Sequence, residues 1–508
     1  MLKRSHLICG ALLMLALWMS TAQVLPQGNA TPVPVTTNIL VWREAGSSPA
    51  ESSPSAPGEL GLMDDTGAFT KLLDVPPQAS RVGACGDEAT SPDESMLAFY
   101  VGLDSGTLYL MKGADAPQAL DEVQRLTCLG SGTFQYSPDS SRLGYIAYEA
   151  DAAASEFADG FLHVVNTADL SEALRYENVV AFDLTDDGAA FVSFFTNDRS
   201  QADEAAIFWW NGNAEREVTT MRPDENCFYT SASVAVAPDG SLVVMLGHRC
   251  TSGDTRTSWQ LHRVNVEERS TSMAASDFLA GLFASFAGTN QVTVLPDGNT
   301  ALFLLPDGIT ANTAGLMTLN LEDATMAEVI QNQAVYPTLS GGPNAFPVVS
   351  PDGRWLALVT TSPNNNNTLN VIDLEDPTAA PITVSAGSTG DVISSITFSG
   401  DSQRLIFIAG SPGTGRNANN SLVALDLDTG SDFRIKRGRF APGLAVAPDG
   451  SSVVAMDYQV LEDEREPPYL NLVKINVDTS ETVLLFEGAE IVDGKVTNQQ
   501  FAVPISWR

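Results

Sequence analysis

The side chains that could do chemistry in this chain of 508 residues are few and far apart. Three histidines, His163, His248 and His262, lie beyond the first 22 residues. His163 and His262 each lie three residues before an Asn that ends an apolar segment, so they occupy equivalent places in separate repeats. A zinc site needs several ligands that converge on one ion. We therefore expect histidines of strands and no metal site.

Other candidate sites are incomplete. The stretch Asp426-x-Asp428-x-Gly430 with Asp432 is similar to a calcium loop but lacks the closing Glu of the EF-hand. The glycine-rich segments 387–390 and 410–415 have no strand-to-helix context for binding phosphate. No Gly-x-Ser-x-Gly motif of a serine hydrolase occurs. The sequence predicts no catalytic residue, metal ligand or cofactor. Whether the chain is an enzyme stays open, with a non-enzyme favoured.

The chain is strongly acidic, with 62 Asp and Glu against 27 Lys and Arg and a formal net charge of −35. Such a surface repels phosphate backbones and anionic lipid headgroups. We expect no nucleic-acid partner, no membrane insertion of the mature chain, and a monomer. The charge also favours solubility of a secreted protein.

The N-terminal segment indicates export. Lys3 and Arg4 precede an apolar stretch over residues 7–19, which is short for a membrane span, and small residues follow at 20–22. We predict a signal peptide over residues 1–22, with a retained anchor as the alternative, and a flexible leader over 23–36. The destination is the periplasm or the extracellular space.

Four cysteines lie beyond the predicted signal peptide, and an oxidising compartment favours disulfides between them. If Ala237 faces Gly240 across a hairpin turn, the same register places Cys227 opposite Cys250, although a one-residue bulge would shift it. We predict the disulfides Cys227–Cys250 and Cys85–Cys128.

These residues are organised by a short turn that recurs along the chain, most clearly as Ala237-Pro238-Asp239-Gly240. Proline presets φ for the second position of a type I turn, Asp is tolerated at the third and Gly is favoured at the fourth. Apolar segments flank each copy, so each indicates a β-hairpin. The spacing of roughly 50 residues indicates a repeat fold. The copies begin at Ser91, Ser137, Thr185, Ala237, Leu295, Ser350, Ser399 and Ala447.

A second landmark follows the turns, where an apolar segment ends in a residue whose side chain can cap a turn. These residues are Asn166, Asn211, Asn265, Asn320, Asp373, Asp426 and Asn476. Each repeat is then four strands joined by a Pro-Asp-Gly turn, a variable loop and an Asx turn. Inner segments such as 242–246 are apolar without alternation and need cover on both faces. Four-stranded sheets packed face to face around a ring, as in a β-propeller, provide that cover.

The two ends of the chain predict how the ring closes. Residues 38–73 contain a second, third and fourth strand without a first, and residues 500–507 resemble a first strand without a successor. We predict one all-β domain over residues 37–508. It is a single β-propeller of eight or nine four-stranded blades, closed by pairing of the N- and C-terminal strands.

The segment Ser350-Pro351-Asp352-Gly353 with the apolar strand after it resembles the WD-repeat-like β-propeller repeats of TolB and of the N-terminal domain of dipeptidyl peptidase IV. The resemblance covers nearly the whole mature chain and implies the fold. It implies little about function, because these families bind or gate different partners. Peptidase activity is not implied, since no hydrolase domain follows the repeats.

Long polar loops between second and third strands are expected on the rim opposite the Pro-Asp-Gly turns. They are 43–58, 149–160, 199–204, 249–256, 362–367, 411–420 and 461–468. Insertions on one face often mark a binding surface, although merely tolerated insertions would look the same. We expect a non-catalytic binding or scaffold module that contacts a protein, peptide or glycan there, with His248 and Arg249 near the loops. The alternative is a propeller hydrolase or lyase with a cation in the central channel.

Overall fold

The structure is a computed structural model of the chain. The residues it describes are 38–45, 58–75, 88–93, 95–102, 106–123, 134–148, 160–198, 201–251, 257–280, 292–295, 297–306, 314–323, 325–329, 334–335, 348–361, 367–376, 379–388, 390–411 and 413–507. Within them the regular structure is β-strand apart from one short 3-10 helix, η3 (Gly415–Asn417). Accordingly, the described segments contain no helix with the length and apolarity of a membrane span. The predicted signal peptide and leader, residues 1–36, lie outside these ranges.

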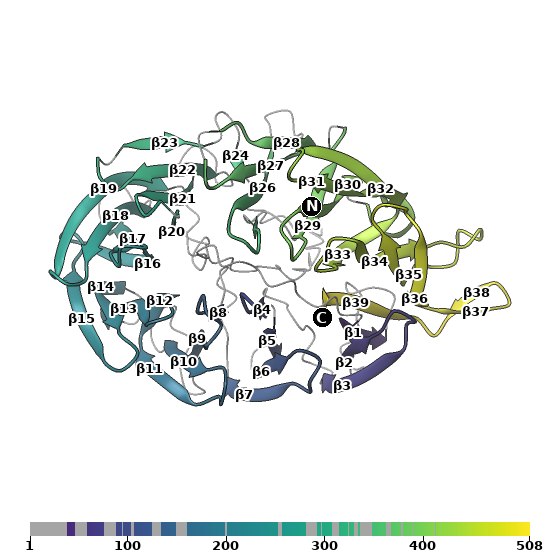
Figure 1. Cartoon of the computed structure of the whole chain (residues 1–508), viewed down its shortest axis with the longest axis horizontal. Coiled ribbons are helices and arrows are strands. Elements are labelled where there is room, and N and C mark those ends of the chain that lie inside the picture. The colour runs from purple at the N-terminus through teal and green to yellow at the C-terminus, as the bar shows by residue number, and fades with distance from the viewer. Residues whose placement is uncertain are drawn as a thin grey trace, which may run out of the picture.

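The strands form a β-propeller, with sheets arranged around a central axis (Figure 1). In the described part of the chain, hydrogen bonds gather the strands into seven sheets of four or more strands. Five of the sheets have four strands, one has eight and one has nine. The expectation of eight or nine four-stranded blades is therefore wrong.

The miscount has a physical cause, because turns mark hairpins and do not show which hairpins share a sheet. Strand β14 (Gln201–Trp210) begins inside the expected loop 199–204, and its Ala202 pairs with Tyr229 of strand β16. That pair joins two predicted repeats into the eight-stranded sheet. The short strand β24 (Ala334–Val335) joins two more into the nine-stranded sheet.

The strand bounds follow the order of the sheets around the ring. The closing sheet contains β3 (Phe69–Val75), β2 (Gly58–Met63), β1 (Ile39–Ala45) and β39 (Gln500–Trp507). The next two contain β4 (Glu88–Thr90), β5 (Met96–Gly102), β6 (Gly106–Lys112) and β7 (Gln118–Val123), then β8 (Phe134–Tyr136), β9 (Arg142–Tyr148), β10 (Gly160–Asn166) and β11 (Glu172–Glu177). The eight-stranded sheet contains β12 (Val179–Leu184), β13 (Ala189–Asp198), β14, β15 (Glu215–Met221), β16 (Cys227–Val236), β17 (Leu242–Cys250), β18 (Thr257–Asn265) and β19 (Ser270–Ala280).

The remaining sheets complete the ring. The nine-stranded sheet contains β20 (Val292–Val294), β21 (Thr300–Pro306), β22 (Ala314–Asn320), β23 (Met326–Glu328), β24, β25 (Val348–Val349), β26 (Trp355–Thr361), β27 (Asn367–Asp373) and β28 (Ile382–Ser385). The last two sheets contain β29 (Val392–Phe398), β30 (Arg404–Ser411), β31 (Asn419–Asp426) and β32 (Ser431–Gly438), then β33 (Phe440–Val446), β34 (Ser452–Gln459), β35 (Tyr469–Asn476) and β36 (Thr482–Phe486). A hairpin absent from the sequence prediction, β37 (Glu490–Val492) with β38 (Lys495–Thr497), projects from the ring (Figure 1).

The ring closes between the first and last described strands. Strand β39 pairs antiparallel with β1, with Ile39 opposite Trp507. Lys474 Nζ, on β35, donates to Asp65 Oδ1 at 2.6 Å and ties the last sheet to the closing one. The predicted pairing of the N- and C-terminal strands is thus present.

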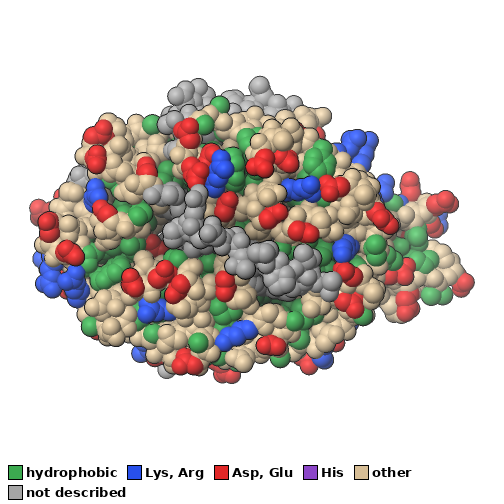
Figure 2. Space-filling view, in the orientation of Figure 1, with side chains coloured by type: hydrophobic (Ala, Val, Ile, Leu, Met, Phe, Trp, Pro, Cys, Tyr) green, Lys and Arg blue, Asp and Glu red, His purple; other side chains and the backbone are tan. Residues whose placement is uncertain are grey.

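The hydrophobic core lies between neighbouring sheets. Ile406 and Leu422 of one sheet pack in a single buried cluster with Val453 and Ile475 of the next. Strands covered on both faces can be apolar without alternation, which explains runs such as Leu242 to Leu246. The acidic side chains stay outside and are spread over the face seen in Figure 2.

Candidate functional site

The rim with the Pro-Asp-Gly turns uses its polar groups internally. Ser137 Oγ donates to Asp139 Oδ1 at 2.6 Å and accepts the backbone N–H of Arg142 at 3.0 Å. Asp139 Oδ1 also accepts the N–H of Ser141. The turns that begin at Ser91, Ser350 and Ser399 repeat this pattern. The first residue of the turn therefore has a specific role that the sequence reasoning did not assign.

Two serines in these turns also connect neighbouring repeats. Ser140 and Ser402 stand where other copies have Gly, and both keep a positive φ, 63° and 57°. The Ser140 hydroxyl accepts the N–H of Asp93, and the Ser402 hydroxyl accepts the N–H of Asp352 at 3.0 Å. A left-handed conformation is unfavourable for a residue with a side chain, and the hydrogen bond to the next repeat offsets that strain.

The Asx landmarks also serve as turn caps. Asn476 Oδ1 accepts the N–H groups of Asp478 and Thr479. Asp426 Oδ1 accepts the N–H and the hydroxyl of Thr429, both at 2.8 Å. Asp426 is thus a turn cap between β31 and β32, as its position in the repeat predicts.

The histidines do not come together. His163 lies on β10, where its Nδ1 is 2.9 Å from Glu172 Oε1 and its ring stacks on Tyr145. His262 lies on β18, and its burial lowers its pKa. His248 is buried on β17. Among the described residues no three His, Cys, Asp or Glu side chains gather in a group that could hold a metal ion.

Cys227 and Cys250 lie opposite each other at the open end of the β16–β17 hairpin and are bonded, with their Cα atoms 3.9 Å apart. The expected register was nevertheless wrong near the turn, where Val236 faces Leu242. A bulge between Tyr229 and Ser231 shifts the register by one residue, so the two deviations cancel at the cysteines. Cys85 and Cys128 lie outside the described residues.

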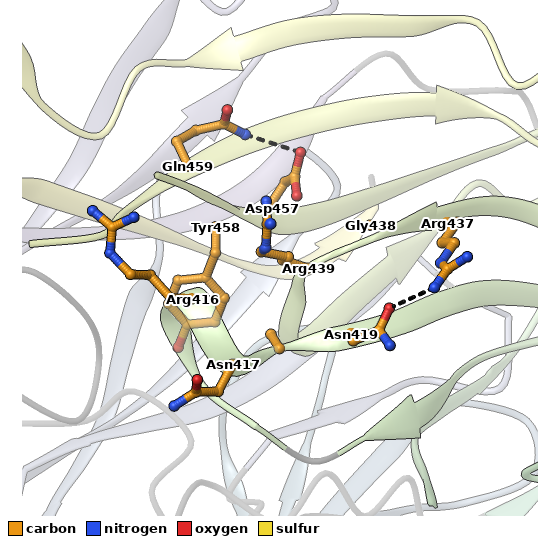
Figure 3. Close-up of a pocket in the computed structure, with 10 residues that line it drawn as sticks. Arg416, Asn417, Asn419, Arg437, Gly438, Arg439, Asp457, Tyr458 and Gln459 are labelled. Atoms are coloured by element: carbon orange, nitrogen blue, oxygen red, sulfur yellow. Dashed lines mark hydrogen bonds between the residues drawn. The ribbon is translucent and has the colours of Figure 1, made fainter. Parts of the chain in front are cut away.

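A polar pocket of about 490 Å³ opens at the rim opposite the Pro-Asp-Gly turns. It lies between the last two four-stranded sheets, where β31, β32 and β34 reach that rim (Figure 3). Two of the predicted loops, 411–420 and 461–468, meet beside it. The residues that line the pocket are Arg416, Asn417, Ala418, Asn419, Arg437, Gly438, Arg439, Asp457, Tyr458 and Gln459.

The crossover from β32 to β33 forms one wall of the pocket and is held from both sides. The buried Asn420 side chain accepts the N–H of Phe440 and donates to its carbonyl, both at 2.8 Å. Tyr458 N–H donates to the Arg439 carbonyl at 2.8 Å. Gly438 allows the Phe440 ring to lie against the backbone, because a Cβ at Gly438 would be 2.7 Å from that ring. The backbone between Arg437 and Arg439 is therefore fixed.

Arg416 connects the two loops. Its guanidinium donates to the carbonyl oxygens of Leu461, Asp463 and Glu466 at 2.8 to 3.1 Å. Because these bonds occupy several of its N–H groups, Arg416 serves the wall of the pocket. Gly415 beside it has a φ of 56° and lies against Pro468.

The other two arginines are less occupied. Arg437 donates one hydrogen bond, to Asn419 Oδ1 at 3.1 Å (Figure 3). The exposed Arg439 guanidinium has no hydrogen-bond partner among the described residues. Residues two apart in an extended segment point to the same side, so both guanidinium groups are presented together.

A partly buried carboxylate completes the site. Asp457 Oδ2 accepts the Gln459 side-chain amide at 3.0 Å (Figure 3). Burial raises the pKa of Asp457, although hydrogen bonds from the Arg439 N–H and Gln459 and the charges of Lys436 and Arg439 oppose the rise. The pocket thus offers guanidinium donors, amides and a carboxylate acceptor to a polar ligand.

The sequence prediction identified the loops beside the pocket but none of its side chains. A signal was present, because Arg434, Lys436, Arg437 and Arg439 place four of the chain's 27 basic residues within six positions. A local cationic cluster in an acidic chain indicates a place for an anion. The strand that carries it was identified only as the fourth of its repeat.

No protein-family model and no curated protein matches this sequence. Solved structures do: a eukaryotic initiation factor is 11% identical, with a TM-score of 0.49 over 93% of this chain and 99% of that one. An oligogalacturonate lyase in complex with manganese is 14% identical, with a TM-score of 0.41 over 75% and 86%. TolB from Acinetobacter baumannii is 12% identical, with a TM-score of 0.27 over 79% of each chain. Similarity at this level carries no argument about substrate or partner, and the fold of this chain is established by its own strand pairing: it is a β-propeller.

Proposed function

We propose that this chain is a non-catalytic binding module of an exported protein, of the TolB or dipeptidyl peptidase IV repeat type. Its binding site is the pocket between β31, β32 and β34. The partner is recognised at the loop-rich rim through polar contacts, and it is a protein, a peptide or a glycan.

One observation carries this proposal: the pocket has a fixed wall but unoccupied donors. Asn420 and the backbone of Tyr458 hold the crossover, while the Arg439 guanidinium has no partner among the described residues. Binding is favoured when the protein groups are ordered before the ligand arrives. On the opposite rim, the Ser and Asp side chains of the turns bond one another.

The proposal is tested by a ligand screen with matched variants. The full exported chain is screened by thermal shift against amino acids, short peptides and neutral and acidic sugars. Each ligand that raises the melting temperature is then titrated into Arg439→Gln and Arg222→Gln by calorimetry. Arg222 is an exposed arginine paired with Glu204 on another sheet, so it controls for the loss of one surface charge.

We expect at least one ligand whose affinity falls at least tenfold in Arg439→Gln and stays within twofold in Arg222→Gln. Ligands that bind both variants equally well would place recognition elsewhere and overturn the proposal. A screen without any ligand would also overturn it. The enzyme alternative has no supporting observation in the described part of the chain and is not proposed here.

A further inference from the structure

We infer that the pocket takes a sugar acid, a hydroxylated ring with one carboxylate, whose carboxylate faces Arg437 and Arg439 and whose hydroxyls face Asp457 and the side-chain amides. This inference rests on the proposed function, because it names the ligand class of the same pocket.

The two arginines account for the carboxylate. A guanidinium presents parallel N–H groups that match the two oxygens of a carboxylate. Arg439 is uncommitted among the described residues, and Arg437 retains donors beyond its bond to Asn419. Both extend from a crossover held by Asn420 and Tyr458, so the guanidinium groups start from a fixed backbone.

The charge of the whole chain limits how much negative charge the ligand can carry. A net charge of −35 repels polyanions, while four basic residues within positions 434–439 make this one place locally favourable. A single carboxylate experiences the local attraction with little of the long-range repulsion, because salt screens charges more than about 10 Å away. A ligand with one negative charge is therefore favoured over a phosphorylated polymer.

The remaining lining accounts for the hydroxyls. Asp457 is an acceptor, and the side chains of Asn417, Asn419 and Gln459 carry both donors and acceptors, which suits a group that both donates and accepts. Gln459 bonds to Asp457 and so orients its carboxylate. Of the lining side chains, Ala418 and Tyr458 supply most of the apolar surface. A peptide would need apolar subsites for its side chains, so the lining favours a sugar.

The size of the pocket agrees with a small ligand. Its volume of about 490 Å³ falls within the range of roughly 300 to 1,000 Å³ typical of small-molecule sites. Its walls come from two neighbouring sheets, and Arg416 links the loop of one sheet to the loop of the next. A ring held between these walls would contact both sheets.

The test compares matched pairs of sugars that differ in the carboxylate. Glucuronate and galacturonate are titrated into the full chain beside glucose and galactose, by calorimetry and by ligand-observed NMR. The variants are Arg439→Gln, Arg439→Lys and the control Arg222→Gln, each with a melting curve to show that it is folded. Acetate is added as a competitor that has the charge without the ring.

We expect at least one uronate to bind at least tenfold more tightly than its neutral hexose. Arg439→Gln should weaken the uronate at least tenfold and leave the neutral sugar within twofold. Arg439→Lys should lie between, because it keeps the charge but not the planar pair of donors. Arg222→Gln should change nothing.

Equal affinity for uronate and hexose would overturn the inference, as would competition by acetate at the concentration at which the uronate binds. If a neutral sugar or a peptide binds and depends on Arg439, the sugar-acid assignment falls while the proposed binding site stands. If no ligand depends on Arg439, both fall.

Discussion

The two rims of this propeller use polar side chains in opposite ways. On the rim of the Pro-Asp-Gly turns, Ser137 and Asp139 bond each other and the backbone around them. On the opposite rim, Asn420 and Arg416 bond the backbone, while Arg439 extends from that framework without a partner among the described residues. The first rim is chemically closed, and the second presents unsatisfied groups.

This difference indicates where binding is to be sought. A hydrogen-bonding group that is already satisfied gains little from a ligand, because the ligand must replace a bond that exists. A group exposed on a rigid support gains a bond at small entropic cost. The repeated turn, although it dominates the sequence, therefore belongs to the rim with less capacity for recognition.

The largest effect is expected from Asn420, which supports the pocket wall. Asn420→Ala leaves the N–H and the carbonyl of Phe440 buried without a partner, and we expect unfolding to become easier by about 4 kcal/mol, at about 2 kcal/mol per group. Urea denaturation followed by fluorescence measures this change. The matched variant on the turn rim, Asn476→Ala, should cost about 1 kcal/mol because water can replace its exposed bonds. Equal losses would mean that the two rims do not differ in this respect.

The disulfide on the loop-rich rim should have the next largest effect. Replacing Cys227 and Cys250 by Ser removes a link across a sequence separation of 23 residues, for which the chain-entropy model gives about 3 kcal/mol. Denaturation with and without a reductant measures it, and mass spectrometry of the unreduced protein identifies the bond. If reductant leaves the stability of the unmodified chain unchanged, the bond does not form in solution.

A smaller effect is expected at Ser402 on the turn rim. Ser402→Ala loses the bond to the Asp352 N–H and keeps the positive φ, so it should destabilise the fold by about 1 kcal/mol. Ser402→Gly loses the same bond but relieves the backbone strain, so its melting temperature should lie above that of the Ala variant. The reverse order would show that the strain at this turn is negligible.

The smallest effect separates the carboxylates of the two rims by pH. Burial acts to raise the pKa of Asp139, but the bonds from Ser137 and Ser141 outweigh it and the pKa lies below the ordinary 3.8. Asp139 therefore stabilises the fold above pH 3.8, and this contribution is lost as the pH falls through its lower folded-state pKa. The pKa of Asp457 is raised by burial, so its ionised form is disfavoured by folding, and this penalty disappears as the pH falls below its folded-state pKa toward 3.8.

Carbon-13 NMR of the aspartate carboxyl groups measures both titrations. The midpoint of Asp457 should lie above 3.8 and that of Asp139 below it. If the two midpoints coincide, the rims do not impose different environments on their carboxylates.

Much of the fold could be predicted from the sequence because its signals are local. Turn residues such as Pro238 and Gly240 and the caps at Asn476 and Asp426 act through backbone groups a few positions away. Ring closure could also be predicted, since unpaired strands at the two ends must find each other to satisfy their hydrogen bonds. The loops beside the pocket were identified for the same reason, as interruptions in a regular repeat.

The sheet count and the pocket depended on contacts between residues far apart in the chain. One backbone pairing, Ala202 with Tyr229, joins two repeats into one sheet, and nothing in the spacing of the turns encodes it. Arg439 and Asp457 belong to different sheets and meet only because the ring packs those sheets face to face. The sequence fixes hairpins, turns and caps because their energies are local, whereas the packing of the sheets determines which side chains share a pocket.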